Sequence, residues 1–234
     1  MRLGWAAIIT LIAVSTWTSV WADTTSGSFQ DLEVMEEKAA HDRNQRAVAV
    51  IRYVRQTPLG TRFAVDTESK SVEVEVVLMD EKKMVKPLET RSDQKLLVDY
   101  HVKVKKYAEA YYEAVAKVRS GKVKEAGEDF DGLANRFPEH ATAFRGKAAV
   151  YLVSGEAETA LVAASKASVG NPNDPVARSL WGVALLKTGN VAASMNEKAI
   201  VRDLDPKSES INSWEVALVR SKNAALYQRW SGLQ

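Results

Sequence analysis

The sequence contains no cysteine, and only three of its 234 residues are histidine. Without cysteine the chain can form no disulfide, no thiolate nucleophile and no zinc site with sulfur ligands. The three histidines, His41, His101 and His140, are far apart, and no two have the spacing of metal ligands. We therefore expect neither a bound metal nor a cofactor.

Excess charge of one sign is lacking as well. The net charge is +2, from 32 basic and 30 acidic side chains, so the chain has no basic field of the kind that attracts nucleic acid. There is also no glycine-rich phosphate loop and no serine at a nucleophile elbow. We expect a protein that is not an enzyme and does not bind nucleic acid. The alternative is an enzyme with its site in residues 29–90, where few acid–base candidates converge.

The N-terminus has the features of an export signal. The apolar stretch Leu3–Val14 follows a short positive start and is shorter than the roughly 20 residues of a membrane-spanning helix. Val20-Trp21-Ala22 then places small residues where signal peptidase requires them. We expect residues 1–22 to be a signal peptide cleaved after Ala22, which implies a periplasmic or secreted protein with no membrane span after cleavage. A retained membrane anchor is the alternative.

The second half of the sequence repeats every 34 residues. Three glycines have this spacing (Gly121, Gly155 and Gly189), and so do three prolines (Pro138, Pro172 and Pro206). Glycine permits the left-handed backbone that ends a first helix, and proline stops a second helix. The period therefore predicts three units of two antiparallel helices.

These units resemble the tetratricopeptide repeat (TPR) family. The family's small–Gly/Ala–aromatic–Ala–Pro pattern is visible in KVRSGKVKEAGEDFDGLANRFP, YLVSGEAETALVAASKASVGNP and LLKTGNVAASMNEKAIVRDLDP. The resemblance covers about residues 107–208 and implies a mainly α fold, a TPR-like α–α superhelix of three helix-turn-helix units. Apolar residues recur at helical spacing in 209–231, so we expect a C-terminal helix there that caps the open end of the array.

The residues before the repeats follow other patterns. Residues 23–28 are a polar linker, and Phe29–Arg55 has mostly helical spacing, with a strand as the alternative for its far end, AVAVIRYV. Strands are expected at 62–67 and 71–79, where apolar and polar residues alternate, with a possible third strand at 84–88. A long helix over 94–119 then leads into the first repeat. The predicted organisation is a small N-terminal α+β segment, 29–93, which we expect to cap the array, followed by the helical array, 94–234.

The resemblance also implies a concave groove lined by the first helices of successive units. By register, the groove residues are Tyr111, Tyr112, Val115, Arg145, Ala149, Leu152, Leu180 and Val183. Tyrosine and arginine are among the residue types that most often carry binding energy. The expected function is an exported TPR-type adaptor or scaffold that binds a peptide or helix of a partner protein, in the assembly of an envelope complex. The alternative is a self-associating scaffold, a homo-oligomer in which the groove receives a terminal helix of another copy.

Overall fold

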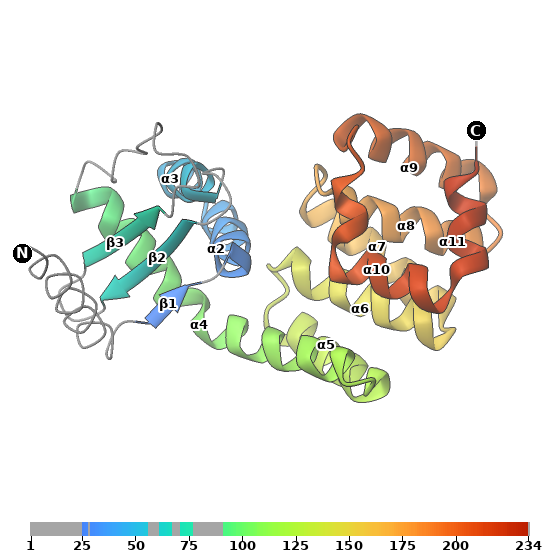
Figure 1. Cartoon of the computed structure of the whole chain (residues 1–234), viewed down its shortest axis with the longest axis horizontal. Helices are drawn as coiled ribbons and strands as arrows, with labels where there is room; N and C mark the ends of the chain where they lie inside the picture. The colour runs from blue at the N-terminus through green and yellow to red at the C-terminus, as the bar shows by residue number, and fades with distance from the viewer. Residues whose placement is uncertain (1–24, 28, 56–60, 67–70, 77–90, 234) are drawn as a thin grey trace, which may run out of the picture. The chain divides into compact units, whose positions relative to one another are not determined.

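The structure is a computed structural model that describes residues 25–27, 29–55, 61–66, 71–76 and 91–233 (Figure 1). These residues fall into two compact units, and the boundary between the units lies after Val104, inside helix α4 (Arg91–Arg119). The expected signal peptide, 1–22, and the possible strand at 84–88 lie outside the described residues. Among the residues that are described, no helix combines the length and the apolarity needed to cross a bilayer.

The N-terminal unit contains a small antiparallel sheet. Its strands are β1 (Thr25–Gly27), β2 (Thr61–Asp66) and β3 (Ser71–Val76), in the order β1-β2-β3. Asp66 pairs with Ser71, so β2 and β3 are neighbours in the register of a short hairpin. The predicted strands at 62–67 and 71–79 agree with β2 and β3 over 62–66 and 71–76, and residues 67 and 77–79 lie outside the described residues. β1 was not predicted, because its three residues lie in the polar stretch that we interpret as a linker.

The helical structure predicted over 29–55 is confirmed, also at its far end, where a strand was the alternative, but it is divided into two helices. They are α2 (Phe29–His41) and α3 (Gln45–Arg55), which pack against each other. The chain leaves the helical path at Arg43, where φ is 56°. Asn44 Oδ1 then accepts a hydrogen bond from the amide of Ala47 at 3.0 Å, which caps α3. The spacing of apolar residues does not reveal a break this short.

The 34-residue period corresponds to helix pairs, as predicted. The first unit pairs residues 107–119 of α4 with α5 (Val123–Arg136), the second pairs α6 (Ala141–Ser154) with α7 (Ala157–Gly170), and the third pairs α8 (Pro175–Lys187) with α9 (Val191–Leu204). At the turns inside the units, Gly121, Gly155 and Gly189 have φ of 81°, 91° and 90°. These are left-handed values that favour glycine. The predicted TPR-like array of three helix-turn-helix units is therefore the fold of this chain.

Small side chains allow the helices of the array to approach closely. Ala126, Ala160 and Ser194 occupy equivalent positions in the three second helices, and none of them is exposed. Ser194 also donates a hydrogen bond from Oγ to the carbonyl oxygen of Gly182 at 2.7 Å, which joins α9 to α8. The third unit thus keeps its pairing although serine replaces alanine.

The C-terminal segment forms a short 3₁₀ helix and two α-helices, where the sequence predicted one capping helix. The elements are η1 (Glu209–Asn212), α10 (Trp214–Lys222) and α11 (Ala224–Ser231). α11 packs against α8 and α9 and covers the third unit, as a cap does. α10 instead packs against α6 and α8, the first helices of the second and third units (Figure 1).

The turn before η1 is held by one carboxylate. Asp205 accepts hydrogen bonds from the backbone amides of Glu209, at 2.8 Å, and Ser210, at 2.7 Å. Desolvation tends to raise the pKa of Asp205, but the hydrogen bonds from Ser210 and Glu209 outweigh it and keep the pKa below its ordinary value. The ionised form of Asp205 therefore stabilises the turn that leads into α10.

Candidate protein-binding site

The predicted groove residues are almost all buried inside the C-terminal unit. Seven of the eight are buried, namely Tyr111, Val115, Arg145, Ala149, Leu152, Leu180 and Val183. Tyr112 is half-buried, and its ring meets the ring of Tyr111 edge-on at 6.0 Å. The set lies on the first helices, as the TPR register implies, but part of it is covered by the chain's own C-terminal segment.

Trp214, the first residue of α10, covers the tyrosine end of the predicted groove. Its indole Nε1 donates a hydrogen bond to the hydroxyl of Tyr111 at 3.1 Å. The indole ring is stacked on Phe130 of α5, with the ring centroids 5.7 Å apart and the planes 13° from parallel. Gly146 leaves room for Phe130, because a Cβ at that position would lie 2.4 Å from the phenyl ring. The stacking and the hydrogen bond of the N–H together fix the orientation of the Trp214 ring on α4 and α5.

Arg145 forms a buried ion network with two carboxylates. Its Nε lies 2.7 Å from Glu215 Oε1, and its Nη1 lies 2.9 Å from Asp174 Oδ2. The exposed fractions of the three residues are 7% for Arg145, 1% for Glu215 and 8% for Asp174. Asp174 is fixed by a second role, since its Oδ1 accepts a hydrogen bond from the amide of Val176 at 2.8 Å and caps α8. The Arg145 fork therefore joins α6 to the start of α8 and to α10.

The rest of the predicted groove is apolar and packs against both C-terminal helices. Leu152, Leu180 and Val183 belong to one buried cluster with side chains of the C-terminal segment, namely Val216, Val219, Tyr227 and Trp230. The carbonyl oxygen of Leu152 also accepts hydrogen bonds from Lys187 Nζ, at 3.0 Å, and Asn223 Nδ2, at 3.1 Å. The apolar contacts and the Asn223 hydrogen bond hold the C-terminal segment against α6 and α8, and the Lys187 hydrogen bond joins α8 to α6.

Sequence reasoning missed four residues of this site: Phe130, Asp174, Trp214 and Glu215. One signal could have found the two carboxylates. Arg145 lies in α6, which is otherwise mostly apolar, and a buried arginine needs paired carboxylates. Asp174 precedes Pro175 in a helix-start pattern, and Glu215 follows a tryptophan in a helical run. The sequence does not indicate that the two carboxylates meet on Arg145.

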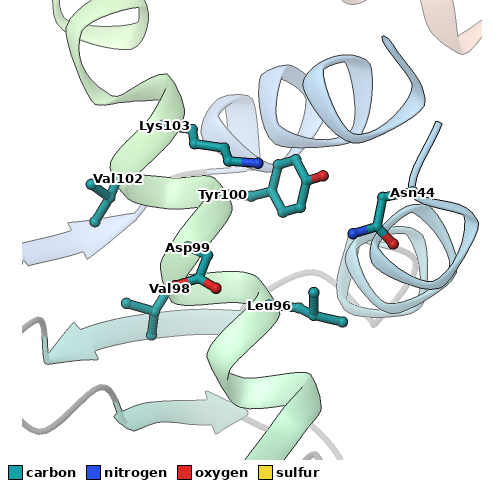
Figure 2. Close-up of a pocket in the computed structure, with 7 residues that line it drawn as sticks. All are labelled: Asn44, Leu96, Val98, Asp99, Tyr100, Val102 and Lys103. Carbon is teal, nitrogen blue, oxygen red and sulfur yellow. The ribbon is translucent and has the colours of Figure 1, made fainter. Parts of the chain in front are cut away.

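The N-terminal unit has a surface hollow along α4. It has a volume of about 420 Å³ and is lined by Asn44, Leu96, Val98, Asp99, Tyr100, Val102 and Lys103. Figure 2 shows Val98 and Val102 pointing to one side of α4, while Tyr100 and Lys103 point to the other. Lys103 Nζ is 3.0 Å from Asp42, and its hydrogen bond lowers the pKa of that carboxyl. The lining groups do not converge on one point, so the hollow is a weaker candidate.

No cluster of three or more potential metal ligands occurs within the described parts of the chain. His140, one of the three histidines, is buried with its ring stacked on Tyr107, the centroids being 4.1 Å apart. This contact gives His140 a packing role.

No family model matches the sequence, and no characterised protein matches it either. Several solved structures are similar, among them three of the type III secretion translocator chaperone SycD of Yersinia enterocolitica. The alternative-dimer form is 19% identical, with a TM-score of 0.42, and the match covers 52% of this chain and 92% of that one. SycD in complex with a peptide of the translocator YopD is 19% identical, with a TM-score of 0.43 and coverages of 53% and 95%. A third SycD structure is 20% identical, with a TM-score of 0.43 and coverages of 52% and 83%. Because these TM-scores are low, the description of this chain as TPR-like depends on its own 34-residue period and paired helices.

Proposed function

We propose that this chain is an exported, non-enzymatic adaptor or scaffold that binds a peptide or helix of another protein at the predicted groove, in the assembly of a cell-envelope complex. One observation carries the proposal: the first helices already hold a helix, α10, through an indole stack, a buried ion pair and apolar contacts. Aromatic, arginine and apolar groups placed together are the usual anchors of helix recognition. The charged groups of the groove, Arg145, Asp174 and Glu215, are paired with one another. This pairing suits the recognition of a protein better than acid–base chemistry.

Site-specific photo-crosslinking in the native host tests the position of the binding site. A photoreactive residue at Tyr112, the half-buried member of the predicted groove, should capture a partner protein that mass spectrometry can identify. The matched control carries the same group at Val169, an exposed residue of the second helix α7. Capture from Val169 and not from Tyr112 would show that the partner binds another face, and the groove proposal would be wrong.

Export is tested separately. The proposal expects the mature chain to start at Asp23, directly after Ala22, and to be found in the periplasm or the medium. N-terminal sequencing of the protein purified from fractionated cells measures this. An intact Met1 in the cytosolic fraction would contradict export without affecting the binding proposal.

Self-association is the second candidate. α10 is joined to α9 only through residues 205–213, so a second copy could supply the same helix to the same surface. Molar mass measured by light scattering across a range of concentrations separates the two candidates. A mass that rises to that of a dimer favours the scaffold, whereas a constant monomer mass favours the adaptor.

A further inference from the structure

Two adjacent side chains of α10 make its ring and ionic contacts with the surface that it covers. Trp214 stacks on Phe130 and bonds to Tyr111, and Glu215 bonds to Arg145. These contacts come from the first turn of α10, and the exposed residues Arg220–Lys222 lie at its other end. The surface therefore contacts an aromatic ring and, in the next residue, a carboxylate, both at the start of a helix.

α10 has the properties of a tethered ligand more than those of a repeat helix. It has nine residues, and isolated helices shorter than about 12–15 residues are marginal in water. Its helical state thus depends on the surface that it covers. It also packs against first helices of two different repeats, α6 and α8, whereas α7 and α9 each pair with the first helix of their own repeat.

We propose that partner helices bind this chain by displacing α10, and that the preferred partner is a short amphipathic helix that begins with an aromatic residue followed by Glu or Asp. This inference rests on the proposed function and specifies the partner. The carboxylate is required because Arg145 is buried, and a partner without a carboxylate would not replace the ionic contact that Glu215 makes with Arg145. The aromatic residue is required because Phe130 and Tyr111 would otherwise lose their stacked and hydrogen-bonded neighbour. Apolar side chains matching Val216 and Val219 complete the buried face.

Displacement must overcome the advantage of an intramolecular ligand. A short flexible tether gives a ligand an effective concentration in the millimolar range. A free helix of equal affinity would therefore bind the intact chain weakly, and it would bind much better where α10 is loosened. The connecting residues 205–213, with the turn held by Asp205, set this competition.

The test uses the full chain and a fluorescein-labelled peptide copying residues 208–232 as the probe. The chain variant Trp214→Ala loosens α10, and the matched control Lys222→Ala changes an exposed residue of the same helix. In fluorescence anisotropy, the peptide should bind the Trp214→Ala chain at least about tenfold more tightly than the wild-type or Lys222→Ala chain. A peptide carrying Glu215→Gln should bind the loosened chain about tenfold more weakly than the unchanged peptide. Equal affinity for all three chains, or for both peptides, would overturn the inference.

A second measurement does not depend on how well the variant folds. Excess unlabelled peptide added to the wild-type chain should increase hydrogen exchange at the amides of α10 and leave α7 unchanged. No increase at a peptide concentration that saturates binding would mean that α10 stays in place, and displacement would be wrong.

Failure of this inference can be distinguished from failure of the proposed function. A native partner that crosslinks to Tyr112 while α10 keeps its exchange protection would support groove binding and refute displacement. Peptide exchange with α10, combined with a native partner crosslinked only to Val169, would support the chemistry of the surface and refute the proposed function.

Discussion

Replacing Glu215 by leucine should destabilise the C-terminal unit strongly, although the two side chains are similar in size. The Glu215 side chain is almost fully buried and lies 2.7 Å from Arg145 Nε. Removing one partner of a buried ion pair leaves the other charge insufficiently compensated, which costs about 3–5 kcal/mol. Asp174 still faces Arg145, so we expect the lower end, about 3 kcal/mol, and a Tm lower by about 10 °C.

A double-mutant cycle isolates the contribution of the pair. Arg145→Met alone leaves Glu215 and Asp174 as buried carboxylates without their cation, so it should also be costly. Arg145→Met combined with Glu215→Leu removes both charges of this pair, so neither of them is left uncompensated, although Asp174 still loses its cation as it does in Arg145→Met alone. The double variant should therefore lose about 2 kcal/mol less than the sum of the two single variants.

Urea unfolding followed by tryptophan fluorescence measures these free energies. Trp181, Trp214 and Trp230 all lie in the C-terminal unit, and the other tryptophans of the chain lie in residues 1–22. The matched control is the exposed pair of Arg202 and Asp203, whose atoms are 3.8 Å apart and whose side chains are each 78% exposed. Its coupling should be close to zero. If the losses at Arg145 and Glu215 are additive, as at the exposed pair, the ion network does not stabilise the docking of α10 and the reasoning is refuted.

Three further predictions concern glycines and acid. Gly182→Ala should lower the Tm, because its Cβ would lie 2.5 Å from Trp230 Nε1, and such overpacking costs about 1–3 kcal/mol; an unchanged Tm would contradict the close approach. Gly155→Val should cost about 1 kcal/mol or more through its φ of 91°, whereas Gly155→Asn should lose less, and equal melting of both variants would exclude backbone strain. Because the pKa of Asp205 is lowered in the folded chain, its stabilising effect is complete above the unfolded pKa and is lost as the pH falls through the folded value. The protection of the Ser210 amide, measured as its hydrogen exchange relative to the intrinsic rate at each pH, should therefore be lost in wild type as the pH falls through the lowered pKa of Asp205, and Asp205→Asn should remove this step.

The repeat architecture could be predicted because it depends on local signals. Glycine at 34-residue intervals marks each left-handed turn, and the three observed φ values confirm it. Proline after each second helix marks the start of the next unit. Such signals act within a few residues, so they can be read without knowing which helices meet.

The covering of the predicted groove could not be predicted in the same way. The apolar spacing of residues 209–231 indicates a helix with one buried face, but it does not indicate which surface buries that face. The answer depends on pairings distant in sequence, such as Arg145 with Glu215 and Trp214 with Phe130. The burial of Arg145 beneath the C-terminal segment also changes the expected effect of Arg145→Glu. An exposed groove would leave such a variant folded, whereas a third carboxylate beside Asp174 and Glu215 should unfold the C-terminal unit.

The docking of α10 alters how the array gains and loses its structure. In a simple solenoid each repeat contacts only its neighbours, so the ends can fray one repeat at a time. Here the hydrogen bond from Trp214 to Tyr111 joins residues 103 positions apart and connects the first unit to the segment that follows the last. Pairings this distant raise the contact order and slow folding, because a long loop must close before the contact forms. The three repeats should consequently unfold in one cooperative transition. α10 should be the last element to dock during folding.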